Sequence, residues 1–218
     1  DGVIKVIRIV RDVVVLEETF AKSVVIEDND HLKTGYLYLP SFYTDMNGGG
    51  GRTSWDDVRL EIRKLKKAGV GRIVFDLRNN GGGSLQDVVN MSGLFIEKGP
   101  VVQVKTRGEQ PEYLEDDDPS VEWDGPLVLM VNQYSASASE IIAAAMQDYK
   151  RAVIIGSNHT FGKGTVQRFF DLNETVRSKD AAQFGSVKIT IQKFYRIDGG
   201  ATQLKGVVSD IKLPDNFT

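Results

Sequence analysis

The sequence predicts an α/β protein, because a pattern of strand, polar turn and helix occurs twice along the chain. The first copy, residues 72–96, reads RIVFDLR, then NNGGGS, then LQDVVNMSGLFI. The second copy, residues 126–149, reads PLVLMVN, then QYSAS, then ASEIIAAAMQDY, and another apolar strand follows at 152–156. Crossovers between such strands are right-handed, so polar groups are expected to gather where strands turn into helices.

The N-terminal third predicts strands followed by one amphipathic helix. Residues 3–16 (VIKVIRIVRDVVVL) are apolar and β-branched, which indicates one or two strands, and residues 35–39 indicate another. The glycine tract at 47–51 predicts a flexible loop. Ser54 is expected to cap a helix that ends near 68–69. The apolar face of this helix is expected to carry Val58, Ile62 and Leu65.

The C-terminal half contains an acidic stretch and a predicted hairpin. Residues 108–124 are acidic and contain prolines, which favours an exposed loop over a core element. The strand pattern at 185–197 is followed by Asp198-Gly199-Gly200 and then by residues 201–207. Because Asp-Gly is typical of tight turns, these segments predict a C-terminal β-hairpin.

Composition and charge exclude several classes of protein. With 218 residues and a net charge of −3, the chain can bury a sizeable core but has no excess of cations for nucleic acid. No apolar run approaches the roughly 20 residues that cross a bilayer. Cysteine is absent, so thiol nucleophiles and thiolate metal sites are excluded. The chain starts at Asp1, so we expect an excised segment whose signal peptide or companion domain lies elsewhere.

The sequence gives little support for a metal site or a nucleotide-binding site. Only His31 and His159 are present, so a three-histidine zinc site is impossible. Both lie in polar surroundings and are expected at the surface rather than in a Ser-His-Asp triad. The segment 162–165 departs from the P-loop pattern, since Gly164 stands where Ser or Thr would bind magnesium. We therefore expect neither a metal nor a cofactor.

A cluster of serines marks the second strand-to-helix turn. Ser137 is its middle member, and an oxyanion formed there would lie near the free N–H groups and the positive dipole end of the following helix. The spacing from Ser137 to Glu140 fits a capping box equally well. Both interpretations stay open at this level, although small neighbours leave room for a substrate backbone beside Ser137.

A serine nucleophile needs a base, and Lys163 is the candidate because no histidine suits the task. To act near neutral pH its pKa must fall from about 10.4 to roughly 7–8, which requires desolvation. The alternative is an ordinary surface cation in a glycine-rich loop. Gln167 would lie on a strand at 165–170 and could orient the amine without adding charge. Asp148 lies about 16 Å along the helix from Ser137, so we expect it to hold a loop or pair with a cation.

Four motifs together resemble one family. The strings FDLRNNGGG, SASASEIIAAAMQDY, FGKGTVQ and GSVKITIQKFYRIDGGATQLKGVVSDIKLP resemble the carboxy-terminal processing peptidases, specifically the tail-specific protease branch. This resemblance covers residues 35–214 and implies a ClpP/crotonase-like core of repeated ββα units. It also implies a Ser-Lys endopeptidase that selects proteins through their C-terminal tails by means of an attached PDZ domain.

The resemblance assigns a role to each candidate residue. Ser137 matches the family's nucleophile, Lys163 its general base and Gln167 the supporting amide. The backbone N–H groups of Ala138 and of a glycine in the 81–83 turn, foremost Gly82, match its oxyanion donors. Asp148 matches a residue that supports the integrity of the fold.

The resemblance also implies a domain arrangement and a location. Residues 1–26 are expected to be strands that join a missing PDZ domain to the core, and residues 27–218 the catalytic core. The expected partners are proteins or peptides with apolar C-terminal tails and the PDZ domain of the same full-length chain. The expected location is the bacterial periplasm or the membrane surface. Two alternatives remain: a non-catalytic scaffold that binds peptides in the same groove, and an acyl-CoA enzyme of the crotonase type, which rests on fold analogy.

Overall fold

The structure, a computed structural model, describes residues 2, 5, 17–45, 51–175 and 184–215. Its centre is a six-stranded sheet in the order β1-β2-β3-β6-β7-β10, in which β1 is antiparallel to β2 and each of the other neighbouring pairs is parallel. The strands are β1 (Lys22–Glu27), β2 (Lys33–Tyr38), β3 (Arg72–Asp76), β6 (Leu127–Val131), β7 (Val153–Gly156) and β10 (Ile211–Lys212). The predicted α/β class is therefore confirmed.

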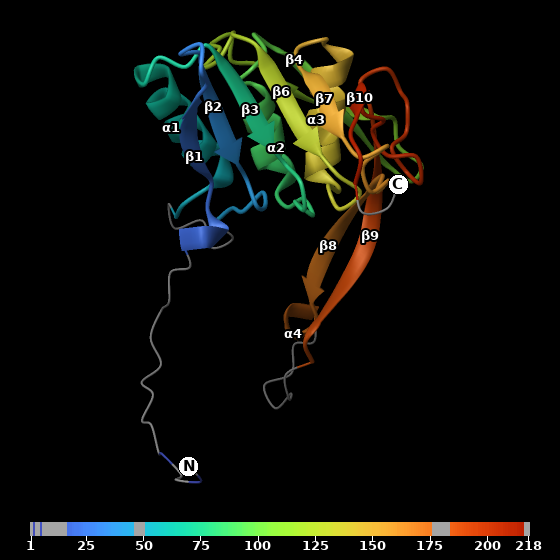
Figure 1. Cartoon of the computed structure of the whole chain (residues 1–218). Coiled ribbons are helices and arrows are strands. Elements are labelled where there is room, and N and C mark those ends of the chain that lie inside the picture. The colour runs from blue at the N-terminus through green and yellow to red at the C-terminus, as the bar shows by residue number, and fades with distance from the viewer. Residues whose placement is uncertain (1, 3–4, 6–16, 46–50, 176–183, 216–218) are drawn as a thin grey trace.

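Three helices cover one face of this sheet (Figure 1). They are α1 (Ser54–Lys67), α2 (Leu85–Ser92) and α3 (Ala138–Asp148); the short elements η1 (Glu17–Thr19) and α4 (Leu172–Thr175) lie outside the layer. The residues that α1 buries include the predicted Val58, Ile62 and Leu65. Apolar side chains at i, i+4 and i+7 share one helix face, which explains why this periodicity was sufficient to find α1.

A second sheet, in the order β5-β4-β9-β8, lies beyond the helices. Its strands are β4 (Gly99–Thr106), β5 (Glu112–Asp116), β8 (Thr165–Asp171) and β9 (Ser186–Tyr195). Strands β4 and β5 contact α2 and α3, so these two helices lie between the sheets. Strands β8 and β9 form an antiparallel ribbon that projects from the layered core (Figure 1).

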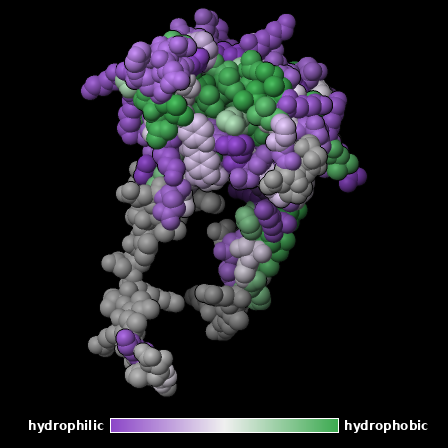
Figure 2. Space-filling model, viewed as in Figure 1, coloured by the Kyte–Doolittle hydropathy of each residue, from purple (hydrophilic) through white to green (hydrophobic). Residues whose placement is uncertain are grey.

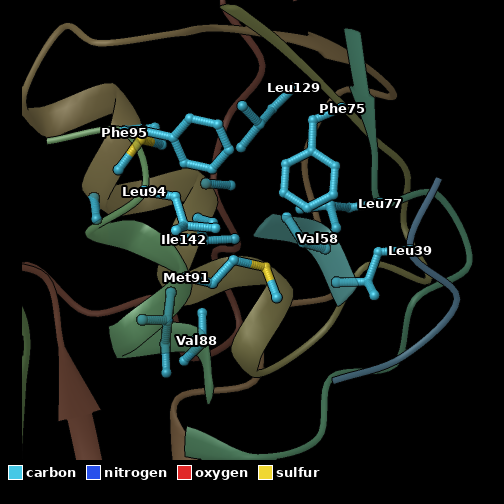
Figure 3. Packing of buried hydrophobic residues seen from close by; sticks show 14 of the residues in the cluster. Leu39, Val58, Phe75, Leu77, Val88, Met91, Leu94, Phe95, Leu129 and Ile142 are labelled. Carbon is cyan, nitrogen blue, oxygen red and sulfur yellow. The ribbon is translucent and has the colours of Figure 1, made fainter. Parts of the chain in front are cut away.

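The core lies between the large sheet and the helices. Phe75 and Leu129 from β3 and β6 face Met91 and Ile142 from α2 and α3, and all four are fully buried (Figure 3). Burial of each such side chain is worth about 1.5–3 kcal/mol before the entropy cost of ordering. The opposite face of the sheet carries exposed apolar residues such as Val24 and Ile211, and Figure 2 shows apolar surface there with a hydrophilic border. The core is therefore one-sided, and it fixes the ends of β3 and β6 from which the candidate site is built.

Two local predictions, on the cap of α1 and on residues 108–124, need correction. The cap of α1 is Thr53, whose side chain accepts a hydrogen bond from Asp56 N, while Ser54 donates to Asp87. Residues 108–124 are not simply an exposed loop, because they contain β5, which pairs with β4. Alternate side chains of β5 face solvent, so an acidic sequence is compatible with a strand there.

The predicted C-terminal hairpin has a different partner strand. Strand β9 pairs with β8, which precedes it in sequence, and the Asp198–Gly200 segment forms a turn closed by a hydrogen bond from Arg196 N to Gly200 O (2.7 Å). Residues 201–207 that follow form no strand. An Asp-Gly turn fixes the local backbone but not what the chain pairs with afterwards. The predicted strands at 3–16 lie outside the described residues except for Lys5, and the predicted loop at 47–51 except for Gly51.

Candidate active site

The predicted site residues other than Asp148 line one cleft of about 800 Å³ at the carboxyl ends of β3 and β6. Its wall includes Ser137, Lys163, Gln167, Ala138 and Gly82, the five residues predicted from different parts of the chain. Neighbouring parallel strands end at the same edge of a sheet, so the turns that follow β3 and β6 lie side by side. The ribbon of β8 and β9 supplies the opposite wall.

The turn between β6 and α3 presents only the middle serine to the cleft. Ser135 and Ser139 are fully buried, and their hydroxyls donate to Leu77 O (2.8 Å) and Asn80 O (2.9 Å), both in the segment after β3. Ser137 between them is partly exposed and lines the cleft. The flanking serines therefore anchor the turn and leave Ser137 free to face a substrate.

Ser137 has a strained backbone. Its φ of 57° and ψ of −112° lie in a region that favours glycine. Such strain costs on the order of 1–3 kcal/mol and persists only where the surroundings enforce it, which occurs most often at functional sites. The strained residue stands directly before α3 and lines the cleft.

This strain predicts a difference between two substitutions. The free energy of unfolding of Ser137→Gly, measured by urea denaturation, is expected to exceed that of Ser137→Ala by about 1 kcal/mol, because only glycine adopts the positive φ without cost. Both variants lack the hydroxyl, so the comparison isolates the backbone. Equal free energies of unfolding for the two variants would show that the turn is not strained.

The glycine turn after β3 comes very close to Ser137. A Cβ atom on Gly82 would lie 2.8 Å from Ser137 Cβ and 2.8 Å from Ala136 O, so only glycine fits there. The N–H of Gly82 donates to Asn80 Oδ1 (2.9 Å). In this arrangement the predicted oxyanion donor is therefore engaged, and an oxyanion would have to compete with the Asn80 side chain. Ala138, the first residue of α3, has a backbone N–H that no carbonyl of its own helix can satisfy.

Glu140 connects the serine turn to the lysine loop. Its side chain is fully buried in the first turn of α3. One carboxylate oxygen accepts from Ser137 N (2.8 Å) and Lys163 N (2.9 Å), and the other accepts from Thr160 Oγ1 (2.7 Å) and Gly162 N (2.7 Å). The capping contact expected between Glu140 and Ser137 N is thus present, and the same carboxylate also holds the backbone of the lysine loop.

Lys163 is placed as a candidate base. Burial lowers the pKa of its ammonium group, the positive charge of Lys188 lowers it further, and the carboxylate of Glu140 acts in the opposite direction. Its carbonyl accepts a hydrogen bond from Thr202 Oγ1 (3.0 Å), which gives the loop a second anchor besides Glu140. A partly buried amine with a lowered pKa spends more time neutral, as a base must.

Gln167 follows on β8, at a break in the ribbon. Val166 pairs with Gln192 but Gln167 pairs with Thr190, so the register shifts between them. The register shift lies directly before Gln167, and Gln167 and Phe169 beyond it line the cleft. Irregular pairing commonly redirects side chains near functional sites.

Other candidates lie apart from the cleft. Asp148 forms an ion pair with Arg196 (2.5 Å), which matches the expected pairing with a cation. His31 and His159 are exposed and neither lines the cleft. Within the described residues, no cluster of three or more His, Asp or Glu side chains is arranged to hold a metal ion. Within the same residues, no helix combines the length and apolar character needed to cross a membrane.

Comparison with known proteins gives the family. The profile of peptidase family S41 matches residues 33–213, which is most of the chain. The chain belongs to peptidase family S41. This S41 chain is 45% identical over 214 residues to the tail-specific protease of Haemophilus influenzae, covering 98% of this chain and 29% of that protein. It is 34% identical to the carboxyl-terminal-processing protease of a Picosynechococcus species, covering 78% of this chain and 38% of that protein.

Solved structures agree with this membership. The photosystem II D1 C-terminal processing protease superposes with a TM-score of 0.71 at 28% identity, over 88% of this chain and 48% of that one. Mature CPAF in complex with lactacystin shares the fold, with a TM-score of 0.67 at 14% identity, over 89% of this chain and 50% of that one. This S41 chain therefore spans about a third of the curated relatives and half of the solved structures that it resembles.

Sequence reasoning missed three residues of the S41 site. Glu140 was expected only as a helix cap, although a glutamate in an otherwise apolar helix turn is a signal for a buried acceptor. Asn80 is fully buried and connects two neighbouring segments. Its side chain donates to Leu39 O after β2, and its backbone carbonyl accepts from Ala136 N in the turn before α3. Lys188 lines the cleft from β9, and only the strand pairing places it there.

Proposed function

We propose that this chain is the catalytic core of a serine endopeptidase in which Ser137 is the nucleophile and Lys163 the general base. One observation carries the proposal: Ser137 and Lys163 line the same cleft, and their backbone N–H groups donate to the same Glu140 oxygen. The lowered pKa of Lys163 supports the assignment, since a neutral amine is what the reaction requires.

The reaction proceeds through an acyl-enzyme. Lys163 Nζ takes the hydroxyl proton as Ser137 Oγ attacks the peptide carbonyl. The Ala138 N–H stabilises the tetrahedral oxyanion, and the Gly82 N–H joins it by exchanging Asn80 Oδ1 for the oxyanion. The protonated amine then gives its proton to the leaving nitrogen as the C–N bond breaks. Water, deprotonated by Lys163, hydrolyses the ester and restores Ser137. Gln167 orients the Lys163 amine without adding a charge that would raise its pKa.

The cleft suits an extended peptide with apolar side chains. Its apolar wall consists of Phe42, Leu85, Ile141, Val166, Phe169 and Phe194. Strand β8 is the edge of the second sheet, so a substrate added beside it would gain backbone hydrogen bonds.

Selection of proteins by their C-terminal tails, and a PDZ domain that performs it, are part of this proposal. They are supported by the relatives, whose names describe tail-specific and carboxyl-terminal processing. In this arrangement residues 1–26 lead from the PDZ domain to a core at 27–218, and their last part, in β1, is already paired with the central sheet. We also propose a periplasmic or membrane-associated location in a bacterium, which fractionation of cells that carry the complete gene product would test.

Acyl-enzyme trapping tests the function directly. The chain and the complete gene product are each incubated, in separate reactions, with a serine-directed acylating probe and with a protein that ends in an apolar tail. The products of every reaction are analysed by mass spectrometry. We expect one adduct, on Ser137, together with cleavage of the protein, and neither with Ser137→Ala. Peptide binding without an adduct or cleavage would instead establish a non-catalytic scaffold.

A further inference from the structure

The charges on the wall of the cleft differ from those of the chain as a whole. The chain carries a net charge of −3, yet among the residues that the structure describes the charged ones that line the cleft are Lys163 and Lys188, with no Asp or Glu. If Lys163 is neutral in the resting enzyme, Lys188 supplies the remaining charge of the wall. A low-dielectric cleft with charge of one sign attracts groups of the opposite sign.

The pairing of β8 with β9 places Lys188 beside the catalytic machinery. Lys188 pairs directly with Phe169, and Gln167 pairs with Thr190, two residues further along β9. Paired residues and those two positions away share one face of a ribbon. Gln167, Phe169 and Lys188 therefore share a face, and all three line the cleft. Lys188 is one cross-strand diagonal from Gln167, a separation of about 7–8 Å between backbones.

Among the described residues, Lys188 has an aromatic neighbour and no ion-pair partner. Its Nζ lies 5.2 Å from the centre of the Phe169 ring, and none of the ion pairs among the described residues involves it. The ring holds the ammonium against the apolar wall without neutralising its charge. The other face of the ribbon offers a natural control, because Arg168 lies over the Phe170 ring (5.8 Å) and does not line the cleft.

We propose that Lys188 forms a carboxylate-binding subsite of the cleft, which selects substrates that carry an acidic side chain or a free C-terminal carboxylate near the scissile bond. This inference rests on the proposed peptidase function. The apolar wall binds the neutral side chains of such a peptide, and Lys188 fixes its register through one charged contact. An ion pair at a partly exposed site is worth up to about 1 kcal/mol, which corresponds to about fivefold in affinity.

The pKa of Lys163 gives a second, independent measure of the charge on Lys188. The positive charge of Lys188 helps to lower the pKa of Lys163, and Glu140 from α3 opposes it. Removal of the Lys188 charge is therefore expected to raise the pKa of Lys163 and to move the acid limb of the pH–rate profile to higher pH. A Lys188 that merely supported the fold would leave this limb unchanged.

Matched peptides and variants test the subsite. Quenched peptides with Glu or Gln at each position beside the cleaved bond, and with a free or amidated C-terminus, are assayed with the wild type, Lys188→Met, Lys188→Arg and Arg168→Met. We expect Lys188→Met to lose about fivefold in kcat/KM for a carboxylate-bearing peptide and little for its neutral partner. Lys188→Arg and Arg168→Met are expected to keep the preference. The Glu/Gln pairs and the free/amidated pairs distinguish the two sources of the carboxylate.

Failure of the subsite and failure of the peptidase assignment give different results. If the wild type cleaves both members of every pair equally, or if Arg168→Met changes the preference as much as Lys188→Met, the subsite is wrong although the peptidase function holds. If no peptide is cleaved, the peptidase assignment fails. Fluorescence anisotropy of labelled peptides then measures the affinity of the protein for the acidic and the neutral peptide. Tighter binding of the acidic peptide that is lost in Lys188→Met would support the subsite, and equal binding would overturn it.

Discussion

Replacement of Lys163 by methionine is expected to lower kcat for peptide hydrolysis by on the order of 10³- to 10⁴-fold. Methionine keeps the length and apolar character of the stem but cannot accept the Ser137 proton. Arginine is expected to fail as well, since a guanidinium stays protonated at every pH at which the protein folds. Lys205→Met, at an exposed position outside the cleft, is the matched control and should retain wild-type kcat.

A double variant and the pH dependence of the rate distinguish a loss of catalysis from a loss of folding. The double variant Ser137→Ala/Lys163→Met should hydrolyse peptides no more slowly than either single variant, because the two residues act as a unit. In the wild type, hydrolysis should rise with pH as Lys163 loses its proton, and the limb should lie below the ordinary lysine pKa because burial and Lys188 lower the pKa. Stopped assays across pH measure both effects. Additive losses in the double variant, or a rate that does not rise with pH, would refute the Lys163 role.

Glu140→Ala is expected to lower the free energy of unfolding by about 3–5 kcal/mol. The substitution leaves four hydrogen-bond donors without their acceptor in a buried region, at Ser137, Thr160, Gly162 and Lys163. Glu140→Gln keeps the shape but turns an N–H₂ group toward some of these donors, so we expect a loss of about 1–3 kcal/mol. Urea denaturation measures both values, and Glu109→Gln, at an exposed position, should stay within about 0.5 kcal/mol of the wild type.

Glu140 also has a signature that a purely structural residue would lack. Its negative charge raises the pKa of Lys163, so Glu140→Gln should move the acid limb of the pH–rate profile to lower pH. Lys188→Met should move the same limb in the opposite direction. Two neighbours of opposite charge that shifted the limb the same way would contradict the electrostatic account of Lys163.

The sequence was most informative where a local pattern carries its own physical reason. Val58, Ile62 and Leu65 are all buried on α1, because helical periodicity depends only on spacing. Residue type and position made Ser137 and Lys163 candidates, the family resemblance assigned their roles, and in the structure both line one cleft. The hairpin partner of β9 was not found, since an Asp-Gly pair describes a turn and says nothing of pairing across a sheet.

By itself the sequence determined the α/β class, the amphipathic helix and the side chains able to form a serine-lysine site, because each depends on residues close together along the chain. The tertiary structure supplied the physical reason that Ser137 faces the cleft: Ser135 and Ser139 are held by hydrogen bonds to the loop after β3. It alone joined Glu140 to the Lys163 loop and placed Lys188 beside Gln167. These contacts depend on strand register and on burial, which arise from packing between segments distant in sequence.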